Sequence, residues 1–172
     1  MTENHIKYMN EIIEACLNME QNKIIRQNLM KAVFEVFEKM YYIYLEPVEN
    51  GAVGIDFSAV EIGFSGDITG NIIARFPREL SMMMAANALG MDDQEMTDPI
   101  LADCRNECLN MLCGNFLQKH NTDKLFHMTL PKAVIGNGGS DLGGRGQIYK
   151  LDLNFESARV PLRVEMIICQ QQ

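Results

Sequence analysis

Residues 58–77, SAVEIGFSGDITGNIIARFP, mark the point at which the hydrophobic pattern of the chain changes from helical to strand-like. Apolar side chains alternate with other residues over 60–64, and a second run rich in β-branched residues occupies 68–76. Alternation of this kind indicates a strand with one buried face, and Ser-Gly-Asp between the two runs favours a turn. We therefore expect a β-hairpin with Gly66 in its turn and Pro77 at its end.

Helical patterns flank this hairpin, and further strand-like segments follow them. The expected elements are, in order, helices over 3–20 and 24–45, the hairpin, helices over 78–90 and 98–120, and strands over 126–134, 146–155 and 160–168. Gln21-Asn22-Lys23 is expected to break the first two helices apart, and 41–45 could equally begin a strand. Segregated helices and antiparallel strands predict an α+β fold, a two- or three-layer α/β sandwich. Residues 1–22 would form an N-terminal extension helix and 23–172 a single domain.

The composition of the chain argues against two classes of protein, those that bind nucleic acid and those that span a membrane. The chain has 172 residues, of which 47% are hydrophobic, and a formal net charge of −8. An acidic chain is poorly suited to nucleic acid, whose recognition needs a basic surface, so partners are expected among proteins or small molecules. No apolar run approaches the ~20 residues of a membrane span. The opening residues also lack the pattern of a secretory signal, so we expect a cytoplasmic protein.

Three of the five cysteines fall within residues 102–115, ADCRNECLNMLCGN, on the expected helix over 98–120. At 100° per residue, Cys104 and Cys108 lie about 40° apart, whereas Cys113 lies about 140° from Cys108. The pair could share a metal ion, but no third ligand stands at a suitable spacing. Because the cysteines accompany the apolar residues of the helix, we expect free, packed thiols and no metal site.

The polar residues of the same helix form a narrower row. The positions involved are Asp103, Glu107, Asn110, Gly114 and Gln118, within a stripe about 80° wide. A solvated helix face is one interpretation. The other is a site in which the Asn amide holds a water molecule, the Glu carboxylate forms an ion pair with a partner, and Gly114 leaves room for close approach.

Several segments in order resemble the CheX-type chemotaxis phosphatases, relatives of CheC and FliY. The segment EIGFSGDITGNIIARF (61–76) is similar to the glycine-marked strand pair of that family, and a short helix ending at Gly90 follows it. DCRNECLNMLCGN (103–115) resembles the family's D/S-x-x-x-E-x-x-N motif plus a small residue, and LPKAVIGNG (130–138) its Pro-containing strand and loop. The resemblance covers roughly 28–168 and implies a CheX/CheC-like sheet packed by two long helices.

The resemblance implies a function and a site. Family members dephosphorylate the aspartyl-phosphate of CheY-like response regulators, so Asn110 would orient the hydrolytic water and Glu107 would pair with the receiver's lysine. Asp103 and Gly114 would support the same face. This chain would need no cofactor, because Mg²⁺ would come with the bound receiver. The earlier helix lacks E-x-x-N around Glu35, so one site per chain is expected, in a homodimer.

Other features have simpler interpretations. The Gly-rich segment 136–147 lacks the ending of a phosphate-binding loop, so we expect a connection between strands. The Met-rich segment 81–91 is expected to fill the core. The N-terminal stripe of Ile6, Met9, Ile13 and Cys16 is expected to pack on the domain or on a second copy, and the alternative is a docking helix for another partner. The alternative to a phosphatase is a non-catalytic adaptor or flagellar-switch-like protein that only binds a receiver.

Overall fold

The computed structural model describes residues 3–49, 57–135 and 148–169, with side chains for 16–49, 57–135 and 149–169. The helices are α1 (Glu3–Tyr41), α2 (Arg78–Leu89) and α3 (Asp98–His120), with a 3-10 turn over Asp93–Glu95. The strands are β1 (Glu46–Val48), β2 (Phe57–Ser65), β3 (Thr69–Pro77), β4 (His127–Met128), β5 (Lys132–Val134), β6 (Ile148–Ser157) and β7 (Val160–Cys169). No helix in these ranges is long and apolar enough to cross a membrane.

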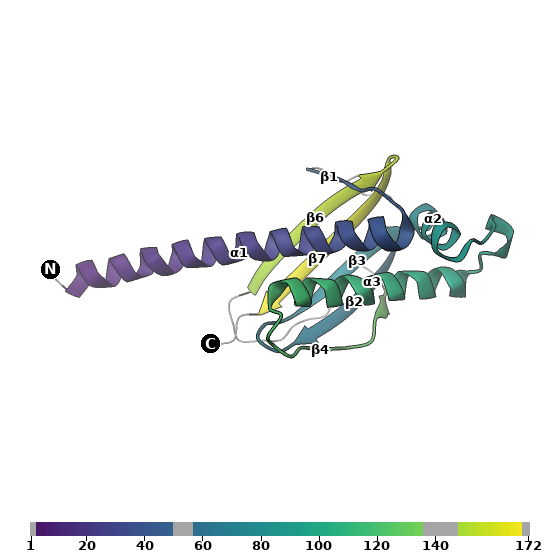
Figure 1. Cartoon of the computed structure of the whole chain (residues 1–172). Coiled ribbons are helices and arrows are strands. Elements are labelled where there is room, and N and C mark those ends of the chain that lie inside the picture. The colour runs from purple at the N-terminus through teal and green to yellow at the C-terminus, as the bar shows by residue number, and fades with distance from the viewer. Residues whose placement is uncertain (1–2, 50–56, 136–147, 170–172) are drawn as a thin grey trace.

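The strands form one antiparallel sheet in the order β1-β6-β7-β3-β2-β4, with β5 also paired to β2. Helices α1 and α3 lie side by side across one face of this sheet (Figure 1). The two layers enclose the main core, because alternate residues of the central strands point at the helices. Ile62, Ile72 and Val164 are fully buried there. The α+β sandwich expected from the sequence is thus confirmed, with two layers in the described residues.

The hairpin expected over residues 58–77 is confirmed as β2 and β3. Its register places Ile62 opposite Ile72, with Gly66 in the connection. The next helix, α2, ends as expected at Gly90, whose φ of 65° is left-handed and whose N–H donates to the Ala86 carbonyl at 2.9 Å. The Met-rich segment contributes Met84 to the main core, as predicted.

The expected break after residue 20 is wrong. α1 runs without interruption through Gln21-Asn22-Lys23, because this tripeptide has neither glycine nor proline to end a helix. The helix ends at Tyr41, and 42–45 form a connection to β1 instead of a strand. The proposed boundary after residue 22 therefore lies inside one helix. Two further differences are small: the strand expected over 126–134 is divided into β4 and β5, and β1 was not foreseen.

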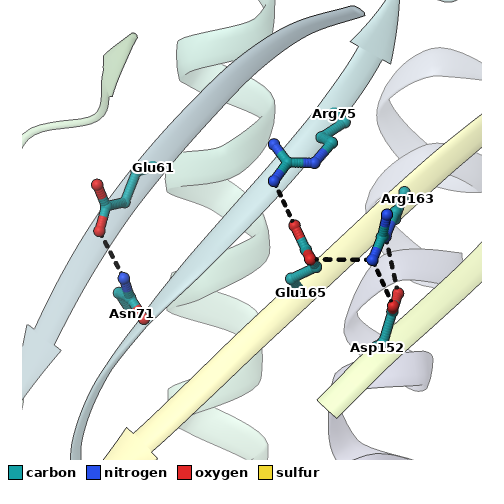
Figure 2. A network of polar contacts seen from close by, with 6 residues as sticks. All are labelled: Glu61, Asn71, Arg75, Asp152, Arg163 and Glu165. Carbon is teal, nitrogen blue, oxygen red and sulfur yellow. Dashed lines mark hydrogen bonds and ion pairs between the residues drawn. The ribbon is translucent and has the colours of Figure 1, made fainter. Parts of the chain in front are cut away.

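The sheet face opposite the helices carries a network of ion pairs and hydrogen bonds across its central strands (Figure 2). Glu165 of β7 lies 2.8 Å from Arg75 of β3 and 3.1 Å from Arg163. Arg163 also donates two hydrogen bonds to Asp152 of β6, at 3.1 and 2.6 Å. The four side chains link three neighbouring strands, and this half-buried face is therefore charged rather than apolar.

A second polar contact extends this face to β2. Asn71 of β3 donates a hydrogen bond to Glu61 of β2, and both side chains are buried. The Lys132 ammonium lies 3.7 Å from the other Glu61 oxygen. The buried carboxylate is thus compensated by an amide and a cation from neighbouring strands, as buried charge requires.

Candidate functional site

The candidate site lies on α3, which begins where the sequence predicts. Proline at its second position lacks the N–H that a first turn leaves unpaired, so Asp98-Pro99 suits a helix start. The inner face of α3 packs into the core through Leu109, Leu112 and Phe116, all fully buried. This packing fixes the rotation of the helix about its axis, so the opposite face is held outward.

Contacts with α1 and α2 fix α3 along its length. At its C-terminal end, Lys119 pairs with Glu35 of α1 at 2.8 Å, and Asn28 donates to the Lys119 carbonyl at 3.3 Å. The pKa of Glu35 is lowered, chiefly by its hydrogen bond with Lys119. Nearer the N-terminus, Arg105 donates to the Ser81 hydroxyl of α2 at 3.2 Å. The candidate residues therefore project from a helix anchored at both ends.

The polar row predicted on α3 lies on its outer face. Asp103, Glu107 and Gln118 are exposed, and Asn110 is partly exposed. Neither Glu107 nor Asn110 forms a hydrogen bond or salt bridge with another residue that the structure describes. Both side chains therefore have hydrogen-bonding capacity available to a partner or to water.

Gly114 lies one turn beyond Asn110 on the same face. A Cβ atom built on this residue meets no heavy atom within 4 Å. The glycine is therefore not required for packing within the described chain. It leaves a bare stretch of helix backbone beside Asn110.

The three helix cysteines have the opposite placement, and all are buried. Cys108 and Cys113 belong to the main core, whereas Cys104 joins a smaller cluster with Leu101 and Met96. Burial raises the pKa of the Cys108 thiol and raises that of Cys113 to about 12. The free, packed thiols expected from the helical wheel are confirmed. In the described ranges, no three His, Cys, Asp or Glu residues are grouped to hold a metal ion.

The sequence did not predict a contact between α1 and α3 beneath the polar row, which joins Tyr41 and Cys108. The Tyr41 hydroxyl, at the C-terminal end of α1, lies close enough to Cys108, the neighbour of Glu107, for the two groups to shift each other's pKa. Burial is the main reason that the pKa of Tyr41 is raised. Tyr41 also stands three residues after Glu38, where a second E-x-x-N motif would need asparagine. The pairing could not be foreseen because it joins residues 67 positions apart through the packing of α1 on α3.

The exposed side chains of the row can bind and orient a water molecule or a partner, but none of them is a covalent nucleophile. An asparagine amide oxygen can accept a hydrogen bond from water and fix the direction of its lone pair without taking its proton. An exposed carboxylate three residues earlier can pair with a cation brought by another molecule. The arrangement therefore suits a reaction in which the partner brings the reactive group and its counterions.

Comparison with known proteins agrees with this description. The family model for the chemotaxis phosphatase CheX matches residues 58–149, which include the hairpin, α2 and the whole of α3. A search of curated protein sequences finds no match.

Solved structures show the same fold. The chemotaxis protein CheX from Vibrio vulnificus has a TM-score of 0.66 and 19% identity, covering 84% of this chain and 95% of its own. A CheC-like superfamily protein from a Shewanella species has a TM-score of 0.67 and 18% identity, covering 86% and 98%. The CheX–CheY–BeF₃–Mg²⁺ complex from Borrelia burgdorferi has a TM-score of 0.63 and 21% identity, covering 84% and 97%.

Proposed function

Because this chain belongs to the CheX family of chemotaxis phosphatases, we propose that it hydrolyses the aspartyl-phosphate of a CheY-like receiver domain. The observation that carries the proposal is the row of Glu107, Asn110 and Gly114 on the outer face of α3, exposed or partly exposed and open to a partner. A solved complex of a structurally similar CheX with CheY supports this class of partner.

The reaction transfers the phosphoryl group from the receiver's aspartate to water. The water oxygen forms a bond to phosphorus as the bond to the aspartyl oxygen breaks, giving inorganic phosphate and a free carboxylate, and the water proton passes to phosphate or solvent. Such transfer depends mainly on positioning and charge compensation, so no nucleophile from this chain is needed. The receiver's lysine and Mg²⁺ belong to the substrate.

Each residue of the row has a separate role in this proposal. The Asn110 amide oxygen accepts a hydrogen bond from the attacking water and directs it in line with the breaking bond. Glu107 pairs with the receiver's lysine and fixes the position of the receiver on α3. Asp103 lies at the end of the same face, and Gly114 lets the receiver backbone approach the helix.

A phosphoryl-decay assay tests the proposal. A CheY-like receiver from the same organism is phosphorylated with labelled acetyl phosphate, and loss of label is followed with and without this protein. Asn110→Ala should reduce the acceleration by about 100-fold or more, since misplaced reactants lose rate on that scale. Glu107→Ala should raise the protein concentration needed for half-maximal acceleration.

Asn115→Ala is the matched control, because Asn115 is a partly exposed asparagine of the same helix, about 140° around the axis from Asn110. It should leave the decay rate unchanged. Asn110→Ala with wild-type activity would refute the assigned role. Stable receiver binding without accelerated decay would instead support the non-catalytic adaptor.

A further inference from the structure

The N-terminal part of α1 extends beyond the rest of the described structure. Among the side chains that the structure describes, the hydrogen bond nearest the N-terminus of α1 is at Asn22, whose carbonyl accepts from the Tyr149 hydroxyl of the sheet at 3.4 Å. Residues 3–21, here called the arm, continue past the sheet and α3 with no other described element beside them (Figure 1). Isolated helices of this length are marginal in water, and helices in proteins depend mainly on packing. We therefore expect the helical arm to be stabilised by packing against a partner.

The side of α1 that packs on the domain does not continue as an apolar face along the arm. Ile24 and Ile25 are neighbours, yet Ile25 is 3% exposed in the core and Ile24 is 51% exposed on the other side. Leu17 is 64% exposed on the same side as Ile24. Positions 6 and 13, both isoleucine, share that side, about 100° and 120° around the helix from the buried Ile25 at 100° per residue.

These four positions, Ile6, Ile13, Leu17 and Ile24, form what we call the outer strip. Their spacings are seven, four and seven residues, which read the same from either end. Two copies of the strip laid antiparallel therefore match each other, with position 6 against 24 and 13 against 17 in both directions. A seven-residue apolar repeat of this kind is the pattern of helices that pair along their length.

We propose that the arms of two copies of this chain, together with the turn of α1 that follows each arm, pair as an antiparallel coiled coil through the outer strip. Charge favours this direction over a parallel one. Residues 3–14 carry three acidic and one basic side chain, whereas 16–27 carry one acidic and two basic side chains. Antiparallel pairing sets the acidic segment of one copy against the basic segment of the other, whereas parallel pairing sets like against like. The inference is independent of the proposed phosphatase activity.

Disulfide trapping in the full-length protein tests the pairing and its direction. Asn10→Cys and Glu20→Cys are placed in separate chains that also carry Cys16→Ser and Cys169→Ser, and one of the chains has an affinity tag. After mixing and mild oxidation, antiparallel pairing predicts crosslinks between tagged and untagged chains. Crosslinks of each variant only with itself would show parallel pairing, and their complete absence would show unpaired arms; either result overturns the proposal.

A matched pair of substitutions tests the strip itself. Leu17→Asp places a charge in the strip and should reduce the mixed crosslink at least about tenfold, since burying an unpaired charge is unfavourable. Met19→Asp is the control, because Met19 is 72% exposed on a different side of α1 and should leave the crosslink intact. Neither side chain is part of the core, so thermal unfolding of the domain should not change in either variant. Leu17→Asp alone should also lower the helical signal in circular dichroism, because the unpaired arm is a marginal helix. Equal crosslinking in both variants would refute the strip as the contact surface.

Discussion

Replacement of Gly114 by alanine should stabilise the protein. The residue lies inside α3, and a Cβ atom there meets nothing within 4 Å, so alanine adds no clash. Glycine in a helix interior is less favourable than alanine by roughly 0.5–1 kcal/mol, because it loses more backbone freedom on folding. For a chain of this size, that gain should raise the melting temperature by about 1–4 °C, measured by circular dichroism.

If glycine at position 114 serves to leave room for the receiver, a larger side chain there should weaken the phosphatase activity. Gly114→Leu keeps a good helix former, but its side chain fills the space beside Asn110 that the receiver is proposed to occupy. Overpacking at a formed contact costs about 1–3 kcal/mol, so half-maximal acceleration should need roughly 5- to 150-fold more protein. Stability should again be at least that of wild type.

Two results would refute this reasoning, and they are separable. A lower melting temperature for Gly114→Ala would show that the face of α3 is packed and not open. Full activity of Gly114→Leu would show that the receiver does not approach the helix there. Gly70→Ala is the contrasting control, because a Cβ on Gly70 would overlap the Ile167 carbonyl and come within 2.8 Å of the Phe64 ring. The Gly70→Ala variant should have a lower melting temperature than wild type, independently of the result for the Gly114 variants.

Other predictions concern packing, charge and thiol reactivity. Phe116→Ala should lower the free energy of unfolding by about 3–5 kcal/mol in urea titration, because the ring is fully buried; a loss below about 1 kcal/mol would contradict this. The Lys119 partner lowers the pKa of Glu35, so its stabilisation is present above the ordinary carboxyl pKa and lost as pH falls. Glu35→Gln should therefore cost up to about 1 kcal/mol at neutral pH, with the difference from wild type vanishing in acid, and a constant difference would disprove this ion-pair origin. A thiol reagent at pH 8 should modify the exposed Cys16 quickly and the buried Cys113 only on unfolding, so rapid modification of Cys113 in the folded protein would contradict its placement.

Local patterns predicted those elements whose signals lie within a few neighbouring residues. Alternation and a turn sequence were sufficient for β2 and β3, and Asp98-Pro99 was sufficient for the start of α3. The outward face of α3 also followed from sequence, because apolar residues on a helix define the opposite polar side. The positions of Glu107 and Asn110 on that face therefore needed no tertiary information.

Predictions failed where a signal was weak or where contacts are distant. The polar Gln21-Asn22-Lys23 looked like a break, but polar residues at solvated positions are compatible with a helix, and only glycine or proline would have ended it. Strand β1 has three residues and exists because β6, a hundred residues later, pairs with it. The Tyr41–Cys108 contact likewise depends on the packing of two helices, and no local pattern reports it.

The polar network on the open face of the sheet has a consequence for how the strands find their partners during folding. Successive side chains of a strand point to opposite faces, so a one-residue slip of β7 would carry Arg163 and Glu165 into the helix-covered core. Such a slip would also separate the Arg163 guanidinium from Asp152 and the Glu165 carboxylate from Arg75, leaving Asp152 and Arg75 without their partners on β7. Strand pairings in the wrong register are thereby strongly disfavoured, and the charged face helps to select the native register of the sheet.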